Sequence, residues 1–150
     1  MSHFARTTLV EAPLSDLWEF HQDVDGLFEL TPSWVGVSVE SIEPADRPLD
    51  AGTEIVFSTS PLGVLPGSTW RSTIVDHTKR DEYAMFRDET DTALVDRWVH
   101  THHFYAVDRG TVVHDEVEYG LRAPIPDKFM RLPLAVLFRY RHWRLHRLFG

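Results

Sequence analysis

"WVHTHHFYAVDRGTVVHDEVEY", residues 98–119, carries the clearest structural signal in this 150-residue chain. Apolar and polar residues alternate on both sides of "DRG", a pattern typical of two strands joined by a tight turn. The same stretch holds four histidines among tryptophan, phenylalanine and tyrosine. It therefore predicts an antiparallel hairpin that carries a metal site, a catalytic site or the polar lining of an apolar pocket.

Alternation along the two strands determines which side chains share a face. Because Glu116 and Glu118 face water, Asp115 turns inward with the apolar residues. A two-residue turn at Arg109-Gly110 would place residue 104 opposite 115, 102 opposite 117 and 100 opposite 119, with His102 diagonal to Asp115. A longer turn would shift this register. The expected inner faces comprise Trp98, His100, His102 and Phe104 on one strand and Val113, Asp115, Val117, Tyr119 and Leu121 on the other.

The residues before the hairpin predict one strand, two short helices and four more strands. Strand-forming residues occupy positions 4–10. Pro13 suits a first helical turn, and the second short helix must end before Pro32. The first helix places Leu14, Leu17, Trp18 and His21 on one face. Period-two alternation predicts six successive strands, hairpin included, at residues 34–43, 52–60, 68–77, 81–89, 93–107 and 110–121.

Residues from about 128 onward predict one long helix. The order of elements indicates a single α+β domain over residues 1–150, a seven-stranded curved antiparallel sheet wrapped around this helix, because both have an apolar face to bury. A curved sheet cannot fill all the space beneath one helix, so a cavity is expected there. The apolar stripe comprises Leu134, Leu137, Phe138, Leu145, Leu148 and Phe149; Arg139, His142, Arg144 and His146 lie largely off it.

Composition narrows the class of protein. The chain has no cysteine, which excludes disulfides, thiolate metal sites and cysteine nucleophiles. Residues 1–127 hold all 23 acidic residues and 9 of the 15 basic ones, and such an acidic body argues against nucleic acid as a partner. The chain shows no signal-peptide pattern and no long apolar run, so a cytoplasmic location is expected.

Several motifs resemble the START-like (SRPBCC) superfamily. They are "AP" before the first helix, "LTPSW" after the second, and "W-x-H-x-H-x-F" followed by "GTVVHDEVEY". The chain is similar to small prokaryotic ligand-binding members with polyketide cyclase-like or cell-division-inhibitor-like labels. The resemblance implies the helix-grip fold and a deep cavity for lipids, polyketides, sterols or similar molecules. By position, Trp98, His100, His102, Phe104, Asp115 and Tyr119 match the subgroup's pattern.

The leading functional hypothesis is binding of a small hydrophobic molecule (a lipid, polyketide or isoprenoid-like compound) by a carrier or sensor. Aromatic residues and a few polar groups on inner faces match the usual composition of a small-molecule pocket. His100, His102 and Asp115 would hold the polar end of the ligand. The expected ligand-binding residues are Phe57, Trp70, Phe86, Trp98, His100, His102, Phe104, Asp115, Val117, Tyr119, Leu134 and Phe138.

Two other interpretations involve the same polar residues. A cyclase, dehydratase or hydrolase would use His100, His102 and Asp115 for acid–base catalysis. Two histidines at i and i+2 also point the same way and could bind a metal ion with Asp115 as third ligand. The simpler expectation is a buried hydrogen-bonded cluster that also includes Asp88, with no metal and no cofactor. A regulatory role in cell division rests only on the family labels.

Two surface features have further interpretations. The apolar loop at residues 60–68 is either a packed hairpin tip or a lid over the cavity mouth, opposite residues 122–129. The basic C-terminal helix either pairs with the acidic sheet or makes transient membrane contact through Arg139, Tyr140, Trp143, Arg144 and Arg147. His103 and His114 are expected on the solvent side of the hairpin, and His146 on the polar side of the helix.

Overall fold

The computed structural model of the protein describes residues 2–45, 48–60, 62 and 67–150. These residues form one antiparallel sheet with the strand order β1-β7-β6-β5-β4-β3-β2. The strands are β1 Ser2–Val10, β2 Val37–Glu43, β3 Glu54–Thr59, β4 Ser68–Lys79, β5 Tyr83–Asp91, β6 Val95–Val107 and β7 Gly110–Leu121. The helices are α1 Leu14–Gln22, α2 Val24–Glu29, the 3₁₀ turns η1 Ser33–Val35 and η3 Asp127–Met130, and α3 Arg131–Phe149.

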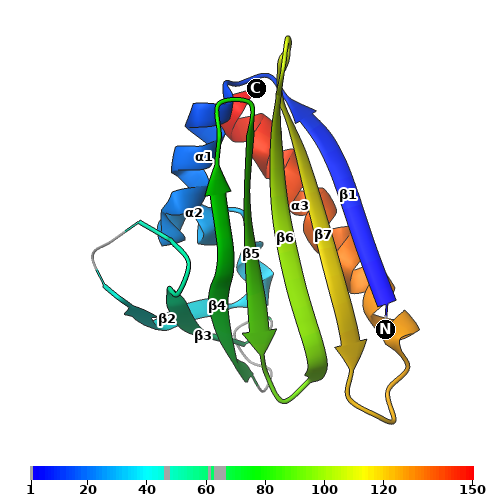
Figure 1. Cartoon of the computed structure of the whole chain (residues 1–150). Helices are drawn as coiled ribbons and strands as arrows, with labels where there is room; N and C mark the ends of the chain where they lie inside the picture. Colours follow the sequence, from blue (N-terminus) through cyan, green and yellow to red (C-terminus); the bar gives the residue numbers. More distant parts are fainter. Residues whose placement is uncertain (1, 46–47, 61, 63–66) are drawn as a thin grey trace.

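The sheet and the helices form two layers. Figure 1 shows the curved sheet with α3 running behind β7 and β1, while α1 and α2 lie on the same side near β4 and β5. Strands that follow one another in sequence from β2 to β7 are also neighbours in the sheet. Strand β1 pairs with β7 and forms the edge opposite β2. The predicted α+β helix-grip architecture, with seven strands, two short helices after the first strand and a long terminal helix, is confirmed.

The turn of the β6–β7 hairpin differs from the sequence prediction. Val107 pairs with Gly110, so the two turn residues are Asp108 and Arg109. The register therefore moves by two residues and places His102 directly opposite Asp115 rather than diagonal to it. An even shift keeps every side chain on its predicted face. Glycine is needed at 110, because a Cβ there would lie 2.2 Å from the Val10 carbonyl oxygen.

The helices cover the sheet with apolar stripes. The predicted face of α1, with Leu14, Leu17, Trp18 and His21, is buried. In α3 the buried positions are Leu134, Phe138, His142 and Leu145, spaced by four, four and three residues. The prediction that His142 lies off the apolar stripe was therefore wrong, since it is only 2 % exposed. Leu148, which was assigned to that stripe, is 40 % exposed.

Two predicted surface features were the apolar loop at residues 60–68 and the basic face of the C-terminal helix. The predicted lid at residues 60–68 lies largely outside the described residues. Within the described residues, no helix is both long and apolar enough to cross a membrane. On α3, Arg144 pairs with Glu29, and the Arg147 guanidinium lies over the exposed ring of Trp143. Transient membrane contact through this helix stays a prediction.

The packing of α3 leads to a stability prediction. Leu134 is 1 % exposed and packs with Val117, Tyr119 and Phe138, whereas Leu132, two residues away, is 73 % exposed. We expect Leu134→Ala to lower the free energy of unfolding by about 2–5 kcal/mol, because it leaves a cavity. The matched Leu132→Ala variant should change it by less than about 0.5 kcal/mol. Urea denaturation measures both, and equal effects would contradict the assigned helix face.

Candidate functional site

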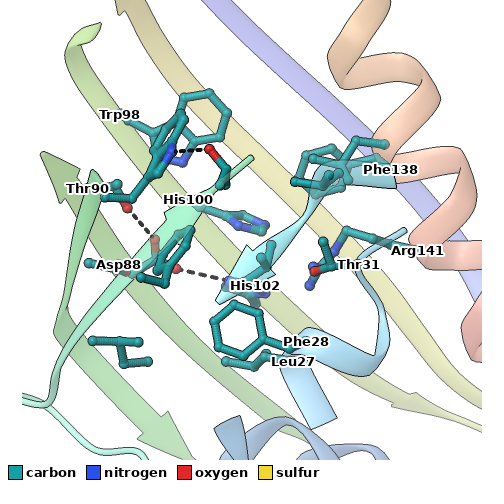
Figure 2. A pocket seen from close by; sticks show the side chains of 18 residues that line it. Leu27, Phe28, Thr31, Asp88, Thr90, Trp98, His100, His102, Phe138 and Arg141 are labelled. Carbon is teal, nitrogen blue, oxygen red and sulfur yellow. Dashed lines mark hydrogen bonds and ion pairs between the residues drawn. The ribbon is translucent and has the colours of Figure 1, made fainter. Parts of the chain in front are cut away.

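A cavity of about 240 Å³ lies between the sheet and the helices α2 and α3. Strands β2 to β6 form its floor, and parts of both helices cover it. Its wall is mainly apolar, with Phe28, Phe57, Trp70, Trp98, Leu137 and Phe138 among the lining residues. The polar lining comprises Thr31, Thr59, Ser72, Asp88, Thr90, His100, His102 and Arg141. Figure 2 shows these side chains converging from the sheet and the helices.

A buried carboxylate, Asp115, joins the sheet to α3 beside this cavity. The Nε2–H of His100 donates to one of its oxygens over 2.8 Å, and the Nε2–H of His142 donates to the other over 2.6 Å. Burial alone would raise the pKa of Asp115, but these two hydrogen bonds outweigh burial and hold the pKa well below 3.8. Asp115 is thus an ionised hydrogen-bond acceptor at neutral pH.

A second histidine–carboxylate pair borders the cavity itself. His102 Nε2 lies 3.1 Å from Asp88, and Thr90 donates to the other oxygen of Asp88 over 3.3 Å. Burial favours the neutral acid in Asp88, yet the hydrogen bond from His102 lowers its pKa overall. Burial and the neighbouring His100 lower the pKa of His102 to about 4. His102 is therefore neutral at pH 7, beside an ionised Asp88.

The structure separates the predicted ligand-binding residues into two groups. Those that border the cavity are Phe57, Trp70, Trp98, His100, His102 and Phe138. Those that lie elsewhere in the interior are Phe86, Phe104, Asp115, Val117, Tyr119 and Leu134. Asp115 reaches the cavity indirectly, through His100. On the outer face of the hairpin, the expected solvent-side His103 and His114 are partly covered by neighbouring side chains.

Sequence reasoning missed several residues of the site. Phe28 and Thr31 come from the end of α2 and the turn after it, where no strand alternation identifies an inner face. Arg141 borders the cavity and His142 contacts Asp115, although His142 was expected off the apolar stripe and Arg141 was not singled out. The spacing from Leu134 through Phe138 could have identified His142, because one more step of four reaches it.

The donor set that suits a metal ion differs from the predicted one. Asp88, His100 and His102 place one ligand atom each within 4.8 Å of one another. Histidine and carboxylate are the ligand types that zinc accepts. In this structure their atoms pair as hydrogen-bonded partners, His102 with Asp88 and His100 with Asp115. The third member of the set is Asp88 rather than the expected Asp115.

The sheet and the helices form a START-like helix-grip fold, and solved structures share this fold. Protein CV1439 from Chromobacterium violaceum matches with a TM-score of 0.72 at 13 % identity, over 99 % of this chain and 98 % of that one. A START superfamily protein from Mycobacterium smegmatis matches with a TM-score of 0.69 at 8 % identity, over 98 % and 96 %. The di-domain ARO/CYC StfQ from the steffimycin biosynthetic pathway matches with 0.68 at 14 %, over 98 % of this chain and 50 % of that one.

The family assignment rests on residues 8–149, which match the model described as "Domain of unknown function (DUF8410)". The chain belongs to this family. No curated protein matches the sequence. The likeness to solved structures shows the fold alone.

Burial of His21 leads to a pH prediction. The Nδ1–H of His21 donates to the Leu17 carbonyl over 2.8 Å, and burial lowers the pKa of His21 from 6.5 to about 3. Between these values unfolded His21 takes up a proton that folded His21 excludes, so acidification destabilises the fold. We expect the free energy of unfolding of a His21→Leu variant to fall less steeply on acidification than that of the wild type. The two slopes should differ by at most about 1.4 kcal/mol per pH unit.

Urea denaturation between pH 4.5 and 7 measures this slope. The exposed His146, which hydrogen-bonds Thr8, supplies the matched control. A His146→Leu variant should retain the wild-type slope. Parallel curves for the wild type and His21→Leu would show that His21 does not carry the pH dependence.

Proposed function

We propose that the protein binds a small hydrophobic molecule in the cavity under α3, as a carrier or sensor. The observation that carries this proposal is the cavity of about 240 Å³ with aromatic walls and a few convergent polar groups. Small-molecule sites in proteins have this composition, with apolar walls for affinity and placed polar atoms for orientation. Structural likeness to a START superfamily protein supports the same class of function.

The size of the cavity narrows the ligand. An engineered apolar cavity of about 150 Å³ accepts benzene. The volume of about 240 Å³ therefore suits a molecule of roughly two fused rings. Among the expected ligand classes, this favours a compact polyketide-like or cyclic isoprenoid-like compound over a long-chain lipid.

Filling the cavity tests this proposal. Ser72 lines the cavity from β4, while Thr73 projects from the opposite face of the same strand. We expect Ser72→Phe to weaken binding of the neutral probe 2-naphthamide about tenfold or more, because its ring occupies the same space. The control Thr73→Phe should bind like the wild type. Isothermal titration calorimetry measures the dissociation constants. Equal affinity in Ser72→Phe and Thr73→Phe would place the probe elsewhere.

The His100–Asp115 pair favours a second candidate function, acid–base catalysis on a bound carbonyl compound. In the neutral form of His100 that donates Nε2–H to Asp115, the other ring nitrogen carries a lone pair. That nitrogen has no hydrogen-bond partner among the described residues, and His100 borders the cavity. A carboxylate that orients a histidine in this way is a common arrangement for a general base.

Proton exchange in a ketone distinguishes this enzyme from a carrier. 2-Tetralone has two fused rings and exchangeable protons beside its carbonyl group. An enzyme of this kind should accelerate their exchange in D₂O about 10²- to 10⁴-fold, and His100→Gln should abolish the acceleration without loss of binding. His103→Gln, on the outer face of β6, is the matched control. Exchange no faster than in buffer, followed by proton NMR, would exclude this chemistry for cyclic ketones.

A further inference from the structure

Arg141 differs from the aspartate and histidines of the cavity because it has no polar partner among the described residues. It borders the cavity from α3, and its Nε is buried without a hydrogen bond. Among the described residues, no carboxylate or carbonyl oxygen pairs with its guanidinium. The guanidinium carbon lies 5.7 Å from the centroid of the Phe138 ring, over its aromatic face. Arg144, one turn away, instead pairs with Glu29.

The two nearby carboxylates are already engaged with other partners. Asp115 accepts hydrogen bonds from His100 and His142, and Asp88 pairs with His102. They act on Arg141 only through space, opposing the burial that lowers the pKa of Arg141. A guanidinium nevertheless stays charged in proteins, with five donors in a planar fork. A charge that is partly shielded from water and has no partner is unfavourable, and an anionic group brought by a ligand would relieve it.

A second polar group lies at the same end of the cavity. Thr31 follows α2 and lines the cavity, and its hydroxyl has no hydrogen-bond partner among the described residues. In Figure 2 the Arg141 and Thr31 side chains point toward one another, on the opposite side of the cavity from Asp88 and Thr90. An anion bound there would be separated from the carboxylate of Asp88.

We propose that Arg141 and Thr31 bind the carboxylate of a compact aromatic acid, whose rings lie against the apolar wall. The planar guanidinium fork matches a carboxylate with two parallel hydrogen bonds, and the Thr31 hydroxyl can donate a third. The aromatic body follows from the rings that line the cavity, including Phe28, Trp98 and Phe138. This inference rests on the proposed binding function and adds the charge of the ligand to it.

A pair of probes of equal shape tests the charge preference in the wild-type protein. 2-Naphthoate carries a carboxylate, and 2-naphthamide is its neutral counterpart. Since hydrogen bonds to charged groups are stronger than neutral ones, we expect 2-naphthoate to bind about 10- to 100-fold more tightly at pH 7. Isothermal titration calorimetry gives both dissociation constants.

Three variants assign this preference to the proposed residues. Arg141→Met should reduce the preference to about twofold or less, because it keeps the length of the side chain without its charge. Arg139→Met removes an exposed arginine of the same helix and should leave the preference unchanged. Valine has nearly the same shape as threonine but no hydroxyl, so Thr31→Val should weaken the binding of 2-naphthoate about 3- to 10-fold. Circular dichroism verifies that each variant is folded.

The outcomes separate this inference from the function on which it rests. Equal binding of the two probes by the wild type would overturn the anion site and leave the hydrophobic cavity as proposed. A preference that survives Arg141→Met would also overturn it. Failure of both probes to bind would contradict the proposed function itself. If Arg141→Met does not fold, Arg141→Lys replaces it; this variant keeps the charge without the fork and should retain only part of the preference.

Discussion

The contact between Asp115 and two histidines is the constraint on which the arrangement of sheet and helix depends. His100 comes from β6 and His142 from α3, and both donate to the same ionised carboxylate on β7. An unpaired buried carboxylate oxygen is unfavourable, and the oxygen of Asp115 that faces His142 has this partner only when α3 lies in this register over the sheet. The hydrogen bonds therefore give α3 a specific position that apolar packing alone would leave less defined.

This position explains why space remains on one side of the helix. The stripe of Leu134 and Phe138 packs on the β7 side of the sheet, with Val117 and Tyr119. Strands β3 to β6 curve away beneath α2 and the other edge of α3, where side chains border the cavity instead of filling it. Strand β6 contributes to both parts of the cavity lining: Trp98 belongs to its aromatic wall and His102 to its polar lining.

Much of the fold could be predicted because alternation and helical spacing are local signals. The hairpin faces followed from Glu116 and Glu118, and a register error of two residues left those faces intact. The site was less predictable because its partners come from distant elements. His142 lies 27 residues from Asp115, and basic composition around it suggested a surface. Likewise, only packing distinguishes Phe86 and Phe104 in the core from Trp70 and Trp98 at the cavity.

A crystal structure determined under xenon pressure tests the relation between this polar contact and the cavity most directly, since xenon occupies apolar cavities. We predict xenon among Phe57, Trp98 and Phe138, with both oxygens of Asp115 in hydrogen-bonding contact with His100 and His142. Side chains that close this space to xenon, or a His142 ring turned away from Asp115, would contradict the account.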